Sequence, residues 1–205
     1  MEGLMRLKAM AKINLGLDVL GKREDGYHEV RMIMQTIRMY DILDIRKTRR
    51  PGIVLTTNLP FIPTDQRNLV YKAAQMLMEE FDVEEGLSIK LRKFIPVAAG
   101  MAGGSSDAAA AFVGVNRMFH LGLTEEQLME RAVKVGADVP YCIMRGTALA
   151  EGIGEKLTRL PEVPKCYVLI GKPGINVSTK TAYENLNLEG IGKHPDIDGI
   201  IGAIR

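Results

Sequence analysis

The segment from Pro96 to Ala111, PVAAGMAGGSSDAAAA, is rich in glycine and alanine and passes directly into a helix-forming sequence. A stretch this poor in bulky side chains leaves its backbone N–H groups open, and the start of a helix adds the positive end of its dipole. Together these features indicate a phosphate-binding site. Close packing of a helix against a sheet is an alternative reason for the small residues.

An apolar face follows this segment at helical spacing and consists of Ala108, Phe112, Val115 and Phe119. This face disfavours a flexible linker. The glycines also exclude two common nucleotide folds. Gly103 and Gly104 are followed by serine, so the P-loop pattern G-x-x-x-x-G-K-[ST] fails, and G-x-G-x-x-G does not occur.

Composition limits the class of protein. The chain has 205 residues, enough for one full domain and part of another, and 46% of them are hydrophobic. A net charge of +2 does not favour nucleic acid or an anionic membrane as a partner. Two cysteines are too few for a disulfide framework or a zinc site. No apolar run approaches the roughly 20 residues of a transmembrane helix. We therefore expect a soluble, cytoplasmic protein.

Local patterns predict an α+β fold. Alternation of apolar and polar residues predicts strands over residues 5–20, 29–37, 41–46, 53–57, 87–92, 141–150 and 167–171. Helices are predicted up to Phe81 after an Asn68 cap, over 106–119, and from a capping box at Thr124 to near Gly136. Residues 197–204 form a further amphipathic stretch.

Three polar features are candidates for chemistry. Lys12 and Asn14 share one face of the first strand, Tyr27 and His28 follow a polar turn, and Asp138 comes just after a helix-ending glycine. Each has a structural alternative: an exposed strand face, a loop edge, and an Asx-turn, respectively. Combined with the glycine-rich loop, a cation and a carboxylate would make a phosphoryl-transfer site.

Three blocks of the sequence resemble the GHMP kinase superfamily: AKINLGLDVLGKREDGYHEV at 11–30, IPVAAGMAGGSSDAAAA at 95–111, and GADVPYCIMRGTALAEGIGE at 136–155. The second block is shared by the superfamily, whereas the first and third point to its 4-diphosphocytidyl-2-C-methyl-D-erythritol kinases. The resemblance implies a GHMP kinase fold, with a ribosomal protein S5 domain 2-like domain at 1–160 and an incomplete ferredoxin-like domain at 161–205. The family's third glycine-rich motif is missing, so we expect a C-terminal truncation that puts turnover in doubt.

The resemblance also implies a reaction, in which ATP phosphorylates the 2-hydroxyl of 4-diphosphocytidyl-2-C-methyl-D-erythritol on the methylerythritol phosphate route to isoprenoid precursors. Mg²⁺ is expected with ATP, and the protein is expected to be a monomer or weak homodimer. Asp138 matches the catalytic carboxylate that orients or deprotonates the hydroxyl. Lys12 matches the catalytic lysine, which holds that carboxylate ionised and offsets charge on the phosphoryl group.

Binding roles follow from the same resemblance. Asn14, Tyr27 and His28 match contacts to the cytidine diphosphate, and Tyr183 sits where a second aromatic ring is frequent. Asn68, Leu69 and Lys93 match positions near adenine. Ala98, Ala99 and Ala102 replace glycines of some members, a change that is tolerable provided these residues keep negative φ. The loop that binds the ATP phosphates consists of Pro96, Val97, Ala98, Ala99, Gly100, Met101, Ala102, Gly103, Gly104, Ser105 and Ser106.

Two other functions remain open. The first is another GHMP kinase, such as a homoserine or mevalonate kinase, which Tyr27 and His28 disfavour because they suit a cytosine ring. The second is a noncatalytic nucleotide- or RNA-binding module. RNA binding calls for a basic face with interspersed aromatic residues, and aromatic residues make up only 5% of the chain.

Overall fold

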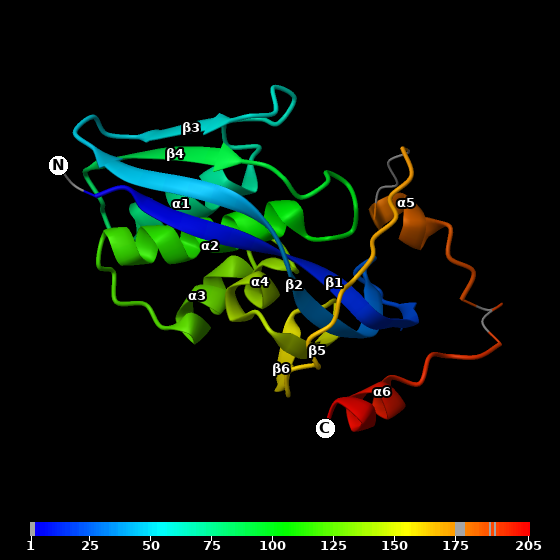
Figure 1. Cartoon of the computed structure of the whole chain (residues 1–205). Coiled ribbons are helices and arrows are strands. Elements are labelled where there is room, and N and C mark those ends of the chain that lie inside the picture. Colours follow the sequence, from blue (N-terminus) through cyan, green and yellow to red (C-terminus); the bar gives the residue numbers. More distant parts are fainter. Residues whose placement is uncertain (1–2, 175–178, 189, 191) are drawn as a thin grey trace.

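The computed structural model describes residues 3–174, 179–188, 190 and 192–205. These form a six-stranded sheet and six helices (Figure 1). The strands are β1 (Met5–Lys22), β2 (His28–Thr48), β3 (Ile53–Thr57), β4 (Gly86–Arg92), β5 (Thr147–Gly152) and β6 (Lys156–Leu160). The helices are α1 (Leu69–Glu80), α2 (Gly103–Met118), α3 (Glu125–Ala132), α4 (Val139–Met144), α5 (Thr179–Glu184) and α6 (Ile197–Ile204).

Strand β2 organises the sheet. Along one edge it pairs antiparallel with β1, from Met5 opposite Ile45 to Lys22 opposite His28. Its other edge is shared, because β5 pairs with residues 30–35 and β4 with residues 42–48. The two runs predicted at 29–37 and 41–46 are therefore one strand. What separates them is a shift of register in the β1–β2 pairing, not a turn: one residue between Met10 and Lys12 of β1 lies opposite three residues, 37–39, of β2.

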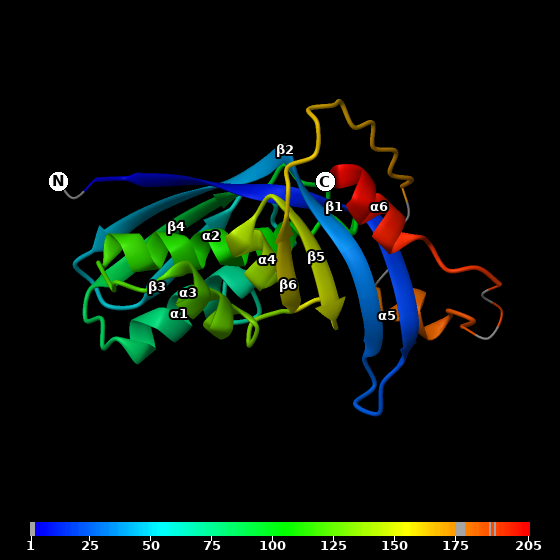
Figure 2. The ribbon, with the colours of Figure 1, turned by 90° about the horizontal axis from the view of Figure 1, so that it is seen from below.

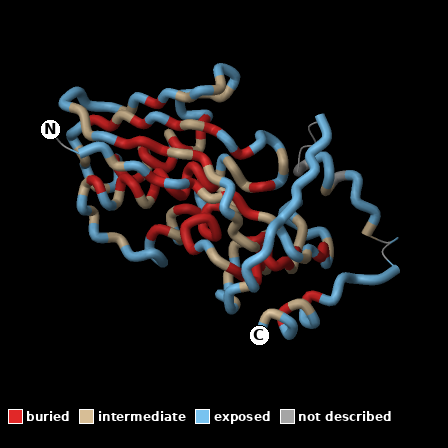
Figure 3. Tube along the Cα trace, viewed as in Figure 1, coloured by how far each residue is buried: buried red, intermediate tan, exposed pale blue. Residues whose placement is uncertain are grey.

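Helices α1 to α4 cover one face of the sheet, and the buried residues gather between them and the strands (Figures 2 and 3). Helix α2 lies closest to the strands, since a Cβ added to Gly114 would come within 2.5 Å of Ile45 Cδ1 and 2.9 Å of Leu7 Cδ1. A helix that packs this closely fixes the position of its own N-terminus relative to the sheet.

Helix α6 covers part of the opposite face. Its Ile197 and Ile201 pack on Ile33 of β2 and Leu149 of β5, in a small cluster separate from the main core. A two-pronged ion pair, with distances of 2.6 and 2.8 Å, joins Arg31 to Asp198. No helix among the described residues is long and apolar enough to cross a membrane.

Predicted elements with strong local signals are confirmed. Asn68 caps α1 by accepting the N–H of Val70, and the capping box at Thr124 is present with both of its hydrogen bonds. Strand β3 has the predicted bounds. Helix α2 begins earlier than predicted, at Gly103, so that Gly103 to Ser105 form its first turn instead of the end of a loop.

One predicted strand, at 141–150, is wrong in its first part, and another, at 167–171, is wrong altogether. Residues 139–144 form α4, with Pro140 in its first turn, where the missing N–H costs nothing, and β5 begins only at Thr147. Residues 167–171 form no strand and lie without a pairing partner among the described residues, with Tyr167 and Leu169 fully exposed. Strand β6 was not predicted because its pattern is short and polar.

Candidate active site

The glycine-rich loop is attached to β1 at the register shift. The backbone N–H of Lys12 donates to the carbonyl of Met101 at 3.1 Å, and the Ser106 hydroxyl donates to the carbonyl of Met10 at 2.6 Å. The Met101 side chain is buried against Ala11 and Ile95. The strand that carries Lys12 is thus bonded both to the loop and to the first turns of α2.

Lys12 and Asp138 meet beside this loop. Lys12 Nζ lies 3.9 Å from Asp138 Oδ2 and donates to Asn14 Oδ1 at 3.2 Å. The Lys12 side chain is only 7% exposed, whereas that of Asp138 is 34% exposed. Asp138 occupies the N-cap position of α4, but its side chain makes no capping hydrogen bond. The structure therefore does not support an Asx-turn role, and the carboxylate is accessible to a small molecule.

The loop itself has a backbone that suits an anion. Ala98, Gly100 and Ala102 have φ of +54°, +69° and +53°, and the residues between them do not have positive φ. This alternation is the pattern of nests, in which successive N–H groups point into one concavity. Ala102 is also the N-cap of α2 and supplies no side-chain acceptor for the N–H groups of the first turn. These groups fit the phosphates of ATP.

The condition of negative φ at the loop alanines is not met by Ala98 and Ala102. An L-residue in the left-handed region costs roughly 1–2 kcal/mol, and glycine does not carry this cost. We expect Ala98→Gly and Ala102→Gly each to raise the free energy of unfolding by about 0.5–1 kcal/mol, measured by urea denaturation.

Ala99→Gly is the matched control for these two substitutions. Ala99 lies in the same loop without positive φ. Glycine there should lower the free energy of unfolding by roughly 0.5–1 kcal/mol, because only the flexibility of the unfolded chain increases. The same loss at all three positions would contradict the strain at Ala98 and Ala102.

The residues predicted near adenine have different surroundings. Leu69 lies beside the start of α2, 3.8 Å from the position of a Cβ added to Gly104. The Asn68 side chain is occupied with capping α1 and with the Pro63 carbonyl, to which it donates at 2.7 Å. The Lys93 ammonium is buried between Asp41 and Asp107. Contacts of these three residues with adenine stay predictions.

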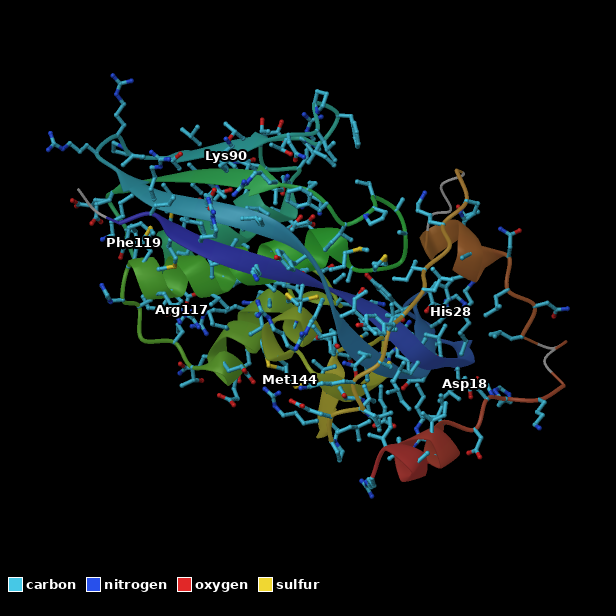
Figure 4. All side chains as sticks on the ribbon, viewed as in Figure 1. Asp18, His28, Lys90, Arg117, Phe119 and Met144 are labelled. Carbon is cyan, nitrogen blue, oxygen red and sulfur yellow. The ribbon has the colours of Figure 1, made fainter. Side chains whose placement is uncertain are left out.

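Of the residues predicted to bind the cytidine diphosphate, Tyr27 and His28 lie at the tip of the β1–β2 hairpin, whereas Asn14 lies beside Lys12. Figure 4 shows His28 at the opposite end of the molecule from Phe119. Tyr27 is 58% exposed, and its N–H is bound by Asp25 at 3.1 Å. The His28 ring stacks on Tyr183 of α5, with centroids 4.9 Å apart. Burial raises the pKa of the Tyr183 hydroxyl, and the charge of Asp138 adds to this effect. Tyr183 is therefore an electrostatic neighbour of Asp138 as well as a partner of the hairpin.

The two ends of the site are far apart. Asn14 pairs with Met34, and His28 pairs with Lys22 at the hairpin tip. Met34 and His28 are six residues apart along the strand, which at about 3.3 Å per residue corresponds to roughly 20 Å. A ligand in contact with both ends would have to be elongated.

Comparison with known proteins decides the family. Residues 68–146 match the family "GHMP kinases N terminal domain". The chain is 57% identical, over 98% of its length, to a 4-diphosphocytidyl-2-C-methyl-D-erythritol kinase of Lachnospira eligens, of which it spans 70%. The chain belongs to the 4-diphosphocytidyl-2-C-methyl-D-erythritol kinase family.

Solved structures agree with this assignment. A crystal structure of a 4-(cytidine 5'-diphospho)-2C-methyl-D-erythritol kinase matches with a TM-score of 0.80 at 31% identity, covering 98% of this chain and 71% of that one. A homoserine kinase from Cytophaga hutchinsonii matches with a TM-score of 0.64 over 95% of this chain and 64% of that one, and at 19% identity it shares the fold alone. The predicted GHMP kinase fold is confirmed, and as a family member the chain is an ATP-dependent small-molecule kinase.

Sequence reasoning missed two residues that lie against the loop of this family member, Asp41 and Asp107. Both are buried acids, and both contact the buried Lys93 ammonium. Asp107 stands directly before the run Ala108 to Ala111 on a buried helix, and Asp41 lies within an apolar strand. An acidic residue is seldom buried without a partner, so an acid within a stretch predicted to be buried indicates a buried cation or hydrogen-bond donor beside it.

Proposed function

We propose that this chain transfers the γ-phosphoryl group of ATP to the 2-hydroxyl of 4-diphosphocytidyl-2-C-methyl-D-erythritol, on the methylerythritol phosphate route to isoprenoid precursors. One observation carries the proposal: the Lys12 ammonium lies 3.9 Å from Asp138, and the backbone of the same lysine is bonded to the glycine-rich loop. Phosphoryl transfer depends mainly on positioning and charge stabilisation, which this arrangement can supply.

The roles follow from position and charge. Asp138 accepts a hydrogen bond from the attacking hydroxyl and takes its proton as the phosphoryl group is transferred. Lys12 offsets negative charge on Asp138 and on the transferring group, and Asn14 holds its ammonium in place. The N–H groups of the loop and of the first turn of α2 bind the ATP phosphates. Mg²⁺ would enter with ATP and offset charge on the β- and γ-phosphates.

The long distance between the hairpin tip and Lys12 supports a cytidylyl substrate. Tyr27 offers an exposed ring for stacking on cytosine, while the alcohol end of the same molecule reaches Asp138. A domain division after residue 160 is supported by the end of β6, the last strand of the sheet, at Leu160. A cytoplasmic location and a monomer or weak homodimer stay predictions.

Replacing Tyr27 with alanine tests the stacking role. Base–aromatic stacking contributes roughly 1–3 kcal/mol, so we expect the Kd of the cytidylyl substrate to rise about 10-fold or more. The Kd of ATP should stay within about two-fold of the unsubstituted protein, because ATP binds at the other end of the site. Both constants are measured by isothermal titration calorimetry.

Tyr27→Phe and Tyr167→Ala are the controls for this substitution. The first keeps the ring, and the second removes a fully exposed tyrosine that lies outside the hairpin sequence. Both should bind the two ligands normally. If Tyr27→Ala weakens ATP and the cytidylyl substrate equally, Tyr27 has a structural role instead.

Homoserine and mevalonate are the substrates of the alternative kinases. Neither is long enough to contact the hairpin tip and Asp138 together. ADP release should therefore require 4-diphosphocytidyl-2-C-methyl-D-erythritol. Faster release with homoserine or mevalonate would overturn the proposed substrate.

A further inference from the structure

A cluster of three charged side chains is buried beneath the phosphate loop. The Lys93 ammonium contacts carboxylate oxygens of Asp41 and Asp107, the latter at 2.6 Å. The three side chains are 5%, 0% and 3% exposed, respectively. They come from separate parts of the chain, since Asp41 is in β2, Lys93 directly follows β4, and Asp107 is in α2.

This cluster connects the two ends of the loop. Asp41 accepts the N–H groups of Phe94 and Ile95, the second at 2.8 Å, immediately before the loop begins at Pro96. Asp107 is the fifth residue of α2, the helix that begins where the loop ends. Because Lys93 contacts both acids, the segment that precedes the loop and the helix that follows it are held against the same buried ammonium.

The charges in the cluster do not balance if both acids are ionised. One ammonium would then face two carboxylates in a buried site, and an uncompensated buried charge is costly. Asp41 receives hydrogen bonds from three donors, which suit an ionised carboxylate. Asp107 receives one, and its Oδ1 is buried without a hydrogen-bond partner.

Asp107 is therefore the acid that can hold a proton. Burial raises the pKa of the Asp107 carboxyl well above its ordinary value, Lys93 opposes this effect, and Asp41 adds to it. The charged groups against Asp107 are Lys93, which follows β4, and Asp41 of β2. Cys142 of α4 is a further titratable neighbour, and its own burial raises the pKa of its thiol.

We propose that Asp41, Lys93 and Asp107 are positioning residues that hold the phosphate loop in its ATP-binding conformation, with Asp41 ionised and Asp107 neutral. The cluster then has no net charge, and the α2 N-terminus keeps its attraction for phosphate. An ionised Asp107 would instead place a second negative charge next to the bound phosphates. The proposal relies on the proposed function only for ATP as the ligand.

Isosteric substitutions in the full chain test the cluster through the Kd of ATP. Asp41→Asn removes the charge that keeps Asp107 protonated, so Asp107 would ionise beside Lys93 and place a negative charge next to the bound phosphates, and the Kd should rise about 10-fold or more. Asp107→Asn replaces a neutral acid by a neutral amide and should change it by less than about two-fold. Asp44→Asn is the control, because Asp44 is a buried acid of the same strand that pairs instead with Arg6 and Arg92.

A second measurement does not depend on ATP. The infrared spectrum at pH 7.5 should contain the carbonyl stretch of a buried protonated carboxylic acid, and this band should disappear in Asp107→Asn. An absent band, an equal rise in Kd for both variants, or an unchanged Kd for Asp41→Asn would overturn the proposal. Failure of the unsubstituted protein to bind ATP would instead count against the proposed function, and the infrared band would still test the cluster.

Discussion

Replacing Asp138 with asparagine should lower the rate of phosphoryl transfer by roughly 10²-fold or more, the usual effect of losing a positioned base. Asparagine keeps the shape of the side chain but cannot take the proton of the attacking hydroxyl. The Kd of ATP should change little, because the loop and the first turn of α2 bind the phosphates. Steady-state kinetics and calorimetry measure the two quantities.

Asp196→Asn is the matched control for this substitution. Asp196 has the same N-cap position in α6 that Asp138 has in α4, and its side chain accepts the N–H of Gly199. Asparagine is an equally good N-cap, so the rate should not change. A near-normal rate in Asp138→Asn would remove Asp138 from the chemical step. A large loss of ATP affinity would indicate a damaged loop.

Replacing Lys12 with methionine should lower kcat by roughly 10²–10³-fold, the effect of removing one preorganised donor at the reacting group. Methionine preserves the length of the side chain and removes only its charge and donors. The backbone N–H of residue 12 remains bonded to Met101, so the attachment of the loop to β1 is retained. The effect on ATP affinity should therefore be much smaller than the effect on kcat.

Lys8→Met tests whether the loss of any ammonium group on β1 lowers kcat, or only the loss of the one beside Asp138. Lys8 lies on the same strand, and its ammonium is 4.4 Å from the centre of the Tyr40 ring instead of beside Asp138. Its replacement should leave kcat unchanged. If the Lys12 and Lys8 variants had the same kcat, the Lys12 ammonium would not take part in phosphoryl transfer.

The parts of the fold that the sequence predicted depend on local signals. The Asn68 cap reaches two residues along the chain and the Thr124 capping box three, and both helix starts were found. The apolar stretch 141–150 was predicted as one strand because periodicity alone does not distinguish a short buried helix from a buried strand. In the structure, Arg145 and Gly146 at positive φ separate α4 from β5.

The candidate site was predictable as a set of residues but not as an arrangement. Motif positions indicated Lys12, Asp138 and the loop, whereas their proximity depends on a register shift in the β1–β2 pairing and on the start of α4. The buried contact of Lys93 with Asp41 and Asp107 joins segments 52 and 14 residues apart, which no local pattern reports. The positive φ of Ala98 and Ala102 likewise follows from the path that the loop must take.

The position of the transferred phosphoryl group tests the central claim most directly. The chain is incubated with ATP, Mg²⁺ and 4-diphosphocytidyl-2-C-methyl-D-erythritol, and the product is analysed by phosphorus and proton NMR. We predict one ADP per product molecule and a new phosphomonoester at the 2-hydroxyl, with the cytidine diphosphate unchanged. ATP that stays intact, or a phosphoryl group on any other oxygen, would contradict the proposed reaction.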